Sequence, residues 1–241
     1  LTCVYKYAYN TNVGDDDMEI KNPLYQNQGI HVIASIFTID KGVAKVLLIK
    51  RNNEPYNGMW ALVGGALYNN ETVTEGMERE IKEKIGIKVN NLEFCEIFSN
   101  PGRSPIMRMV AIAHIGIVDI DKVNILKETL KTTDADWFPI NKIGELAYDH
   151  NEVLKKCIET LKDRIINSDI LKGLYPEGFT IPEIQTVYEA ILEQKFDRRN
   201  FRKKLINTKL IYDTNKTKTF KGSKPAKLYK FVDGIQNKNV F

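Results

Sequence analysis

The sequence contains few of the residues that build covalent or metal-centred frameworks. It has three cysteines among 241 residues, and Cys3, Cys95 and Cys157 are widely separated and odd in number. This pattern excludes a dense disulfide framework and a zinc cluster, so we predict buried thiols in a reducing compartment. The histidines are His31, His114 and His150. None has a second metal-ligating residue at a useful spacing, and we expect structural roles for all three.

Long apolar runs are also missing from the sequence. The longest, from Met109 to Val118, is interrupted by His114 and is much shorter than the roughly 18 residues that span a bilayer. Residues 1 to 28 are rich in Asn, Asp and Tyr and lack a basic stretch followed by an apolar core. We therefore expect a peripheral strand or arm there and no signal peptide, and we expect a cytoplasmic protein with no membrane partner.

The composition is ordinary for a soluble globular protein, with 43% hydrophobic and 27% charged residues. The formal net charge of +4 hides an asymmetry between the two halves. Residues 1–150 contain 16 Lys or Arg and 20 Asp or Glu, a net charge of −4, whereas residues 151–241 contain 19 and 11, a net charge of +8. A chain of this length can form two domains, and the asymmetry predicts that they have different partners.

The first half reads as a series of strands interrupted by one helix. From Gly29 to Arg51 the residues are apolar and β-branched, with a turn signal at Asp40-Lys41-Gly42, which predicts a hairpin of core strands. The segments LEFCEIFSN and MRMVAIAHIGIVDI predict two further strands joined by the turn-rich NPGRSP, and DADWFPI predicts a short strand around Trp137.

The helix is predicted for the stretch that follows Gly64 and Gly65. Thr72 and Glu75 have the spacing of a capping box, and Gly86 is typical of a C-terminal cap. Apolar residues recur every four positions and predict one buried stripe. The stripe consists of Val73, Met77, Ile81 and Ile85.

Two glutamates on the flank of this helix form a candidate cation site. Glu80 and Glu83 lie on the same side as Gly76, so their carboxylates are expected to converge where there is no side chain, and carboxylates suit a hard cation such as Mg²⁺. Lys84 lies about 40° around the helix from Glu80 and can supply positive charge there itself. An ammonium beside a carboxylate replaces the charge of a metal without creating a nucleophilic water. An ordinary amphipathic helix with solvated charges is the alternative.

Two arginines belong to the loop region around NPGRSP, Arg103 within that segment and Arg108 three residues after it. Arg103 and Arg108 carry guanidinium forks that suit phosphate or carboxylate ligands. Simple surface exposure explains them equally well. Residues 151–168 have the apolar spacing of a long helix, which we interpret as the connector between two domains.

The second half predicts a compact basic domain. Thr180 and Glu183 form another capping box at the start of one helix, and Asp197 can cap the next, DRRNFRKKLI. In that second helix Arg199, Arg202 and Lys203 share an exposed face. Two short strand patterns then enclose a loop that carries Lys216, Lys218, Lys221 and Lys224. This order is that of a winged helix-turn-helix.

In a winged helix-turn-helix the second helix enters the major groove of DNA. Arginines there donate to guanine edges, Asn200 adds the capacity to read adenine, and lysines of the wing neutralise phosphates. The alternative is a basic helix that is merely solvated.

The central stretch resembles the Nudix box. Read from Gly65 it runs Gly, five residues, Glu71, seven residues, and then REIKEKIGI to Ile87, with Trp60 ahead of the glycines as in many Nudix proteins. Lys84 departs from the family pattern, which has a glutamate there, and Val63 stands where many hydrolases have proline. The resemblance implies an effector or substrate site at this loop and helix, with a basic residue such as Arg51 facing the ligand.

The two halves together resemble the Nudix-related transcriptional regulators. The segments LAYDH, FTIPEIQTVYEAIL, DRRNFRKKL and GSKPAKLYKF match that family closely. The resemblance implies an α+β fold, a Nudix α/β/α sandwich in residues 1–150 followed by a connector helix and winged helix-turn-helix in residues 151–241. It further implies a homodimer that binds a palindromic double-stranded operator and responds to ADP-ribose, a related nucleotide or a pentose.

This reading assigns roles to specific residues. Effector contacts are expected from Arg51, Gly64, Gly65, Arg79, Glu80, Glu83, Arg103 and Arg108. DNA contacts are expected from Thr180, Arg198, Arg199, Asn200, Arg202, Lys203, Lys221, Ser223 and Lys224. No catalytic residue and no required cofactor is expected, although Glu80 and Glu83 could hold Mg²⁺. The alternative function is a Mg²⁺-dependent Nudix hydrolase acting on ADP-ribose.

Overall fold

The structure is a computed structural model that describes residues 28–220 and 224–232. Cys3, residues 1–27 of the arm expected in residues 1 to 28, and the wing residues Lys221 and Ser223 therefore lie outside the described residues. Within the described ranges no helix is both long enough and apolar enough to cross a membrane.

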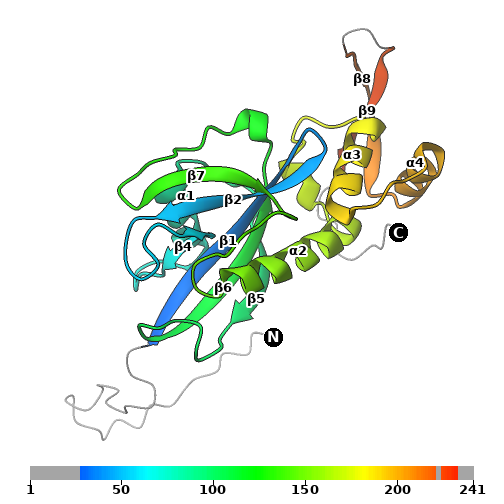
Figure 1. The fold of residues 1–241 in the computed structure, drawn as a ribbon. Helices are drawn as coiled ribbons and strands as arrows, with labels where there is room; N and C mark the ends of the chain where they lie inside the picture. Colours follow the sequence, from blue (N-terminus) through cyan, green and yellow to red (C-terminus); the bar gives the residue numbers. More distant parts are fainter. Residues whose placement is uncertain (1–27, 221–223, 233–241) are drawn as a thin grey trace, which may run out of the picture.

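A mixed sheet forms the centre of the first half (Figure 1). Its strands are β1 (Gln28–Asp40), β2 (Val43–Arg51), β3 (Trp60–Ala61), β4 (Val63–Ala66), β5 (Glu93–Phe98), β6 (Arg108–Ile117) and β7 (Thr132–Pro139). The order is β3-β2-β1-β6-β5, with β4 paired to β1 and β7 paired to β2. The predicted hairpin is β1 and β2, and its turn places Lys41 and Gly42 at positive φ. β1 runs parallel to β6.

A helix covers each face of the sheet. On one face α1 (Val73–Ile85) packs Met77 and Ile81 into a core with Val32 and Ile36 of β1. On the other face α2 (His150–Asn167) packs against the alternate residues of the same strand, including Ile33. The division follows from the period of two along a strand, which sends successive side chains to opposite faces. The expected α/β/α sandwich is confirmed.

The helix predicted as a connector is also a layer of this sandwich. Its residues Val153, Leu154, Cys157, Leu161 and Ile165 are fully or almost fully buried, and they join the core on one face of the sheet. The helix ends at Asn167 and is followed by the short helix η2 (Ile170–Gly173), which packs against β6. α2 therefore reaches from the sheet to the second half of the chain.

The second half is the expected winged helix. It contains α3 (Ile181–Leu192), α4 (Arg198–Asn207) and a hairpin of β8 (Ile211–Lys218) and β9 (Ala226–Phe231). Thr180 and Glu183 form the predicted capping box of α3, and the Asp197 side chain accepts from the backbone N–H of Asn200 at 2.9 Å. Phe201 of α4 packs edge-on against Tyr188 of α3, as its buried position requires.

The two halves share one continuous hydrophobic core. A single cluster of buried side chains extends from Phe37 in the sheet through Leu161 of α2 to Phe201 of α4. The buried hydroxyl of Tyr188 donates to the carbonyl oxygen of Ile165 at 2.6 Å, which joins α3 to the last turns of α2. An ion pair between Lys162 and Glu193 lies beside this contact. The winged helix is therefore packed against the sandwich through α2.

Candidate functional site

The loop before α1 and the helix itself are built as the sequence predicts. The Thr72 hydroxyl accepts from the backbone N–H of Glu75, the Glu75 carboxylate accepts from that of Thr72, and Gly86 closes the helix at a φ of 73°. A β-carbon on Gly64 would overlap the backbone of β1, and one on Gly65 would overlap the carboxylate of Glu80. The two glycines are therefore required by close packing, and they bring the chain over α1.

The carboxylate of Glu80 is buried and lies among cations. Its side chain is 3% exposed, and its two oxygens lie 2.5 Å from Arg79 Nη1 and 3.2 Å from Lys84 Nζ. Lys84 also donates to the carbonyl oxygen of Gly64, so its ammonium bridges the glycine loop and the helix. Burial lowers the pKa of Lys84, while the neighbouring Glu80 carboxylate opposes that shift.

Glu83 and Glu71 are paired with other cations. The Glu83 carboxylate is more exposed and lies 2.5 Å from Lys131 Nζ. Arg79 forms two hydrogen bonds to Glu71, at 2.8 and 2.6 Å, and they lower the pKa of that carboxyl to about 2. The same bonds raise the pKa of Arg79 above its usual value.

These contacts do not leave a ready site for Mg²⁺. A hard cation requires several free oxygen ligands, whereas Lys84, Arg79 and Lys131 lie on the oxygens of Glu80 and Glu83. No group of three or more His, Cys, Asp or Glu residues in the described part of the chain is arranged to hold a metal. The space over Gly76 is taken up by Leu67 and Glu71 rather than left open between the two glutamates. The residues present therefore do not fit the metal.

A cavity of about 560 Å³ opens beside the Lys84 ammonium. Four basic residues and two acidic residues contribute to its lining, and two tyrosines border it. The basic residues are Arg51, Lys84, Arg103 and Lys131; the acidic residues are Glu54 and Glu80; the tyrosines are Tyr68 and Tyr148. An excess of cations in a partly buried site favours an anionic ligand, and aromatic rings offer faces on which a base can stack. The cavity suits a phosphate-bearing small molecule with an aromatic group.

Arg103 anchors one wall of the cavity. Its guanidinium makes two hydrogen bonds to the carboxylate of Asp149, at 2.9 and 2.8 Å, with a side chain that is only 5% exposed. Asp149 immediately precedes α2, so this pair joins the loop after β5 to the start of that helix. Arg103 thus positions the wall and adds positive charge to it.

His150, the first residue of α2, has a defined role in the same wall. Its Nδ1 accepts from the backbone N–H of Leu62 at 3.0 Å, which requires a neutral ring. Burial lowers the pKa of His150 to about 3, and the nearby Arg103 and Arg51 act in the same direction. The ring is therefore uncharged at neutral pH, and the expected structural role agrees with this contact.

Arg51 lies beside Tyr148 in the lining of the cavity. Its guanidinium donates to the carbonyl oxygen of Pro55 at 3.0 Å and lies 5.0 Å from the ring centre of Tyr148. Tyr148 also packs against Tyr56, with ring centres 4.7 Å apart. The guanidinium is therefore held in place against an aromatic face before any ligand binds.

The sequence-predicted effector residues separate into two groups in the structure. Arg51, Gly64, Gly65, Glu80 and Arg103 line the cavity. Arg79 and Glu83 lie behind that lining and pair with residues around it, and Arg108 lies outside it, where it donates to the carbonyl oxygen of Met109.

Sequence reasoning did not identify several of the lining residues as ligand contacts. They are His31, Tyr68, Lys131, Tyr148 and His150. The only available signal was the LAYDH segment, which contains Tyr148 and His150 and was quoted for its resemblance alone.

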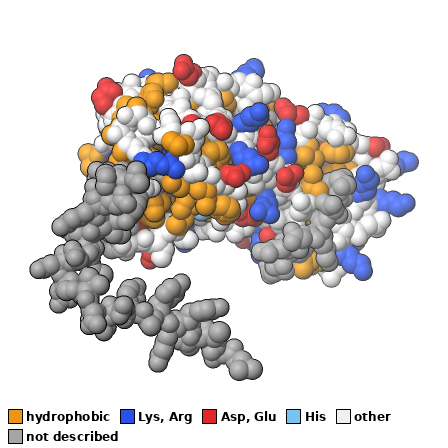
Figure 2. All heavy atoms as spheres, turned by 90° about the horizontal axis from the view of Figure 1, so that it is seen from below, with side chains coloured by type: hydrophobic (Ala, Val, Ile, Leu, Met, Phe, Trp, Pro, Cys, Tyr) orange, Lys and Arg blue, Asp and Glu red, His pale blue; other side chains and the backbone are white. Residues whose placement is uncertain are grey.

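The second candidate surface is the outer face of α4. Phe201 and Leu205 are buried, whereas Arg199, Arg202 and Lys203 are exposed as the sequence predicts. Arg198 and Asn200 are exposed as well. Figure 2 shows Lys and Arg side chains projecting from the end of the molecule at the right, where Figure 1 places the winged helix.

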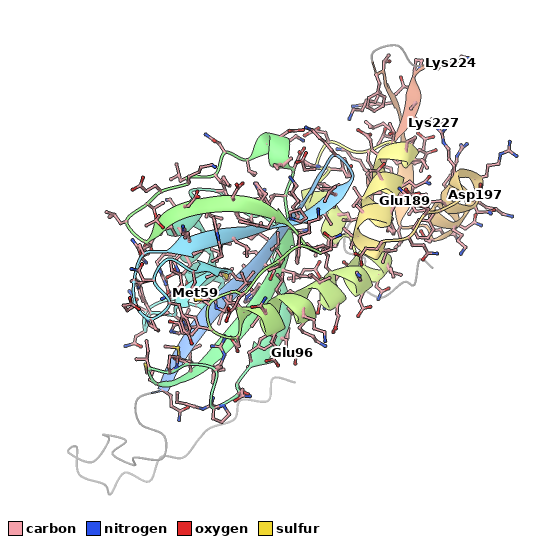
Figure 3. All side chains as sticks on the ribbon, viewed as in Figure 1. Met59, Glu96, Glu189, Asp197, Lys224 and Lys227 are labelled. Atoms are coloured by element: carbon pink, nitrogen blue, oxygen red, sulfur yellow. The ribbon has the colours of Figure 1, made fainter. Side chains whose placement is uncertain are left out.

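The β8–β9 hairpin extends this basic surface. Lys224 lies at its outer end (Figure 3) and is exposed. Lys218 pairs with Glu183 of α3 at 2.7 Å, and Lys227 pairs with Asp213 across the hairpin at 2.6 Å. The Lys218–Glu183 pair links the hairpin to α3, and the Lys227–Asp213 pair joins its two strands.

Thr180 differs from the other predicted DNA contacts. It is only 1% exposed, and its hydroxyl donates to the Glu183 carboxylate in the capping box. A direct contact to a phosphate through this side chain would require the cap to open. The structure therefore gives Thr180 a role in starting α3.

Comparisons with protein-family models match two successive parts of the chain. The NUDIX domain model matches residues 29–161, and the model of the NrtR DNA-binding winged helix domain matches residues 173–231. An ADPR responsive transcriptional repressor, NtrR, from Acinetobacter baylyi is 27% identical over 212 residues, which cover 86% of this chain and 84% of that protein. An ADP-ribose pyrophosphatase from Methanocaldococcus jannaschii is 32% identical over 130 residues, covering 52% of this chain and 73% of that protein.

The same arrangement occurs in a solved structure. The crystal structure of Shewanella oneidensis NrtR complexed with a 27mer DNA has a TM-score of 0.71 at 25% identity, and the match covers 87% of this chain and 98% of that one. Both halves of the chain and their order along the sequence are therefore shared with that protein.

Proposed function

Because this chain belongs to the NUDIX family and carries a winged helix domain of the NrtR type, we propose that it is a ligand-responsive transcriptional repressor. Residues 1–150 would bind a small effector and residues 151–241 would bind operator DNA, with α2 shared between the two parts. We also propose a cytoplasmic location, because the proposed partner is DNA. The observation that carries the proposal is the joining of a cationic cavity to an exposed basic recognition helix through one continuous core.

The cavity favours ADP-ribose over a plain pentose as the effector. Four cationic and two acidic side chains contribute to its lining, and this excess of positive charge attracts a diphosphate, whereas an uncharged sugar gains nothing from it. Tyr68 and Tyr148 can stack on the adenine. The Acinetobacter baylyi relative is described as responsive to ADPR, which agrees with this choice.

The ammonium of Lys84 argues against hydrolysis of this ligand. Nudix hydrolysis requires divalent metal on the glutamates of the helix, and in this chain Lys84 contacts Glu80 and Gly64 instead. The positive charge needed to hold a diphosphate is thus present, while a metal-activated water is not. We propose that neither a catalytic residue nor bound Mg²⁺ is needed for function. The pyrophosphatase from Methanocaldococcus jannaschii favours the alternative of an enzyme, which a direct assay for AMP release from ADP-ribose decides.

Operator binding would use the exposed face of α4 and the hairpin. Arg198, Arg199, Asn200, Arg202 and Lys203 would enter the major groove. Lys224, together with Lys221 and Ser223, would contact the adjacent phosphates. Arginine can donate two hydrogen bonds to guanine, and lysine provides sequence-independent neutralisation.

A homodimer would place two winged helices on a palindromic operator. In such complexes the two-fold symmetry of the protein matches the symmetry of the two half-sites. The exposed side chains of Ile30, Phe94 and Ile97 provide an apolar surface for the second copy. They lie on one face of the sheet, since their strand partners Val110, His114 and Ile112 alternate along β6.

The first test uses the full chain and a duplex from its own promoter region. Fluorescence anisotropy at moderate salt should show tighter binding to that duplex than to a scrambled one, and ADP-ribose should release the duplex while ribose should not. Arg202→Ala should weaken specific binding by about 1–3 kcal/mol. Lys142→Ala, which removes an exposed lysine far from α4 in the sequence, serves as the matched control. Equal affinity for both duplexes would refute the proposal.

The second test concerns the ligand alone. Calorimetry without added metal should detect ADP-ribose binding, and chelation of divalent cations should not abolish it. Sustained release of AMP from ADP-ribose in the presence of Mg²⁺ would instead show that the protein is a hydrolase.

A further inference from the structure

Two cysteines face each other across the contact between β5 and α2. Cys95 lies on β5 and is half-buried, whereas Cys157 lies on α2 and is fully buried. The thiols hydrogen-bond to one another, and the Cys95 sulfur also lies 3.2 Å from the hydroxyl of Thr160, three residues further along α2. Neither cysteine belongs to the effector cavity or to the basic surface of the winged helix.

We propose that Cys95 and Cys157 form a peroxide-reactive thiol pair that closes to a disulfide between β5 and α2. The sulfur of Cys95 attacks one oxygen of hydrogen peroxide, the O–O bond breaks, and a sulfenic acid and hydroxide result. The Cys157 thiol then attacks the sulfenic sulfur, the S–O bond breaks, and a second hydroxide leaves. With the two thiol protons, the products are one disulfide and two waters, and the peroxide is the oxidant reduced.

The surroundings indicate which cysteine attacks first. Cys95 is the more accessible of the two, and the thiolate is the nucleophilic form. Hydrogen bonds from the Cys157 thiol and the Thr160 hydroxyl lower the pKa of Cys95 to about 7, with a smaller contribution from the Lys156 ammonium. The same pairing, together with burial, raises the pKa of Cys157. Cys95 is thus the attacking thiol and Cys157 the one that resolves the sulfenic acid.

The disulfide would fix the middle of α2 to a strand at the end of the sheet. That helix begins at His150 in the wall of the cavity, and near its other end the Ile165 carbonyl oxygen accepts from Tyr188 of α3. A cross-link at Cys157 therefore restrains the element that joins the effector cavity to the winged helix. This consequence rests on the proposed function: the oxidised protein should bind promoter DNA but lose its response to ADP-ribose. The disulfide itself does not depend on that function.

The disulfide is tested on the reduced full chain in a Cys3→Ser background, which prevents pairing through the N-terminal thiol. After treatment with hydrogen peroxide and alkylation of free thiols, peptide mass spectrometry should find Cys95 joined to Cys157. Dithiothreitol should reverse the bond. Figure 3 labels Glu96, the neighbour of Cys95 on β5, which lies in the peptide to be identified.

Single variants separate the two roles. Cys157→Ser should leave Cys95 as a sulfenic acid that dimedone traps, and Cys157→Ala repeats this measurement in case serine disturbs the core. Cys95→Ser should leave Cys157 reduced under the same treatment. Recovery of both cysteines fully alkylated after peroxide, or equal oxidation of Cys157 in the Cys95→Ser variant, would overturn the proposal.

The regulatory consequence is tested by DNA release. The reduced chain should release promoter DNA on addition of ADP-ribose, and the oxidised chain should not, with Cys95→Ser retaining its response after peroxide. A disulfide that forms without changing this response would refute the coupling through α2. Failure of the reduced chain to bind promoter DNA would count against the proposed function, and the mass-spectrometric result would still decide the thiol pair.

Discussion

Replacing Lys84 by glutamate should make the stability of the protein depend on a divalent metal ion, because the Lys84 ammonium that contacts Glu80 and Gly64 is lost. In the wild-type protein the Lys84 ammonium lies 3.2 Å from the Glu80 carboxylate, whose side chain is 3% exposed. Lys84→Glu removes that partner and places a second carboxylate one helical turn away. Loss of one member of a buried ion pair costs about 3–5 kcal/mol. The free energy of unfolding without divalent cations should therefore fall by that amount.

Added Mg²⁺ should restore part of the loss in the variant. Two adjacent carboxylates provide the oxygen ligands that the ion prefers, and a ligand present at 100 times its dissociation constant stabilises the folded state by about 2.7 kcal/mol. Urea unfolding with and without MgCl2 measures both effects. The wild-type protein should respond little, because its carboxylate oxygens already contact Lys84 and Arg79.

Lys82→Glu is the matched control for this experiment. Lys82 lies on the same helix, is exposed, and undergoes the same change of charge. Its substitution should alter the free energy of unfolding by no more than about 0.5 kcal/mol, with no added response to Mg²⁺. If Lys84→Glu is as stable as Lys82→Glu, or if Mg²⁺ stabilises the wild type equally, the reasoning about the ammonium is wrong.

Three further predictions concern the cavity wall and the winged helix. Arg103→Lys should lower the free energy of unfolding by about 1.5–3 kcal/mol in urea titrations, because lysine cannot keep both hydrogen bonds to Asp149; Arg108→Lys, outside the cavity, should have little effect. Since burial lowers the pKa of His150 to about 3, the unfolded chain takes up a proton on this residue below pH 6.5 while the folded chain does not, so His150 should make the free energy of unfolding fall by about 1.4 kcal/mol per pH unit between pH 6.5 and 3. Urea unfolding of His150→Asn should show a slope shallower by that amount, with the remaining slope due to groups such as Glu71, whose pKa is also lowered. Phe201→Ala empties a fully buried site and should cost about 3–5 kcal/mol, abolishing DNA binding in anisotropy while calorimetry still detects ADP-ribose; unchanged DNA binding would contradict the packing of α4.

Local signals in the sequence account for the helices and for the surface of α4. The capping boxes at Thr72 and Thr180 and the left-handed Gly86 were predicted from neighbouring residues, and each depends on contacts within one turn of helix. The exposed basic face of α4 was predicted in the same way, since helical periodicity alone separates Arg202 from Phe201.

The cavity could not be predicted to the same degree because distant segments build it. Arg103 meets Asp149 across 46 positions, and Lys131 meets Glu83 across 48. Helical and strand periodicities relate residues a few positions apart and cannot predict pairs so distant in the sequence. Nothing in the sequence distinguished Arg103 from Arg108, although in the fold Arg103 lines the cavity and Arg108 lies outside it. It also could not show that Glu71 and Leu67 occupy the space over Gly76.

The continuous core between the sandwich and the winged helix limits how the DNA-binding domain could be fused to another protein. An isolated fragment beginning at α3 would expose Tyr188 and Ile184 to water and would leave the Tyr188 hydroxyl without the carbonyl oxygen of Ile165. A chimera that joins this winged helix to another ligand-binding domain must therefore include the last turns of α2. Fusions cut between α2 and α3 lose the contact between Tyr188 and Ile165 and should be poorly soluble, whereas fusions cut ahead of His150 keep that contact.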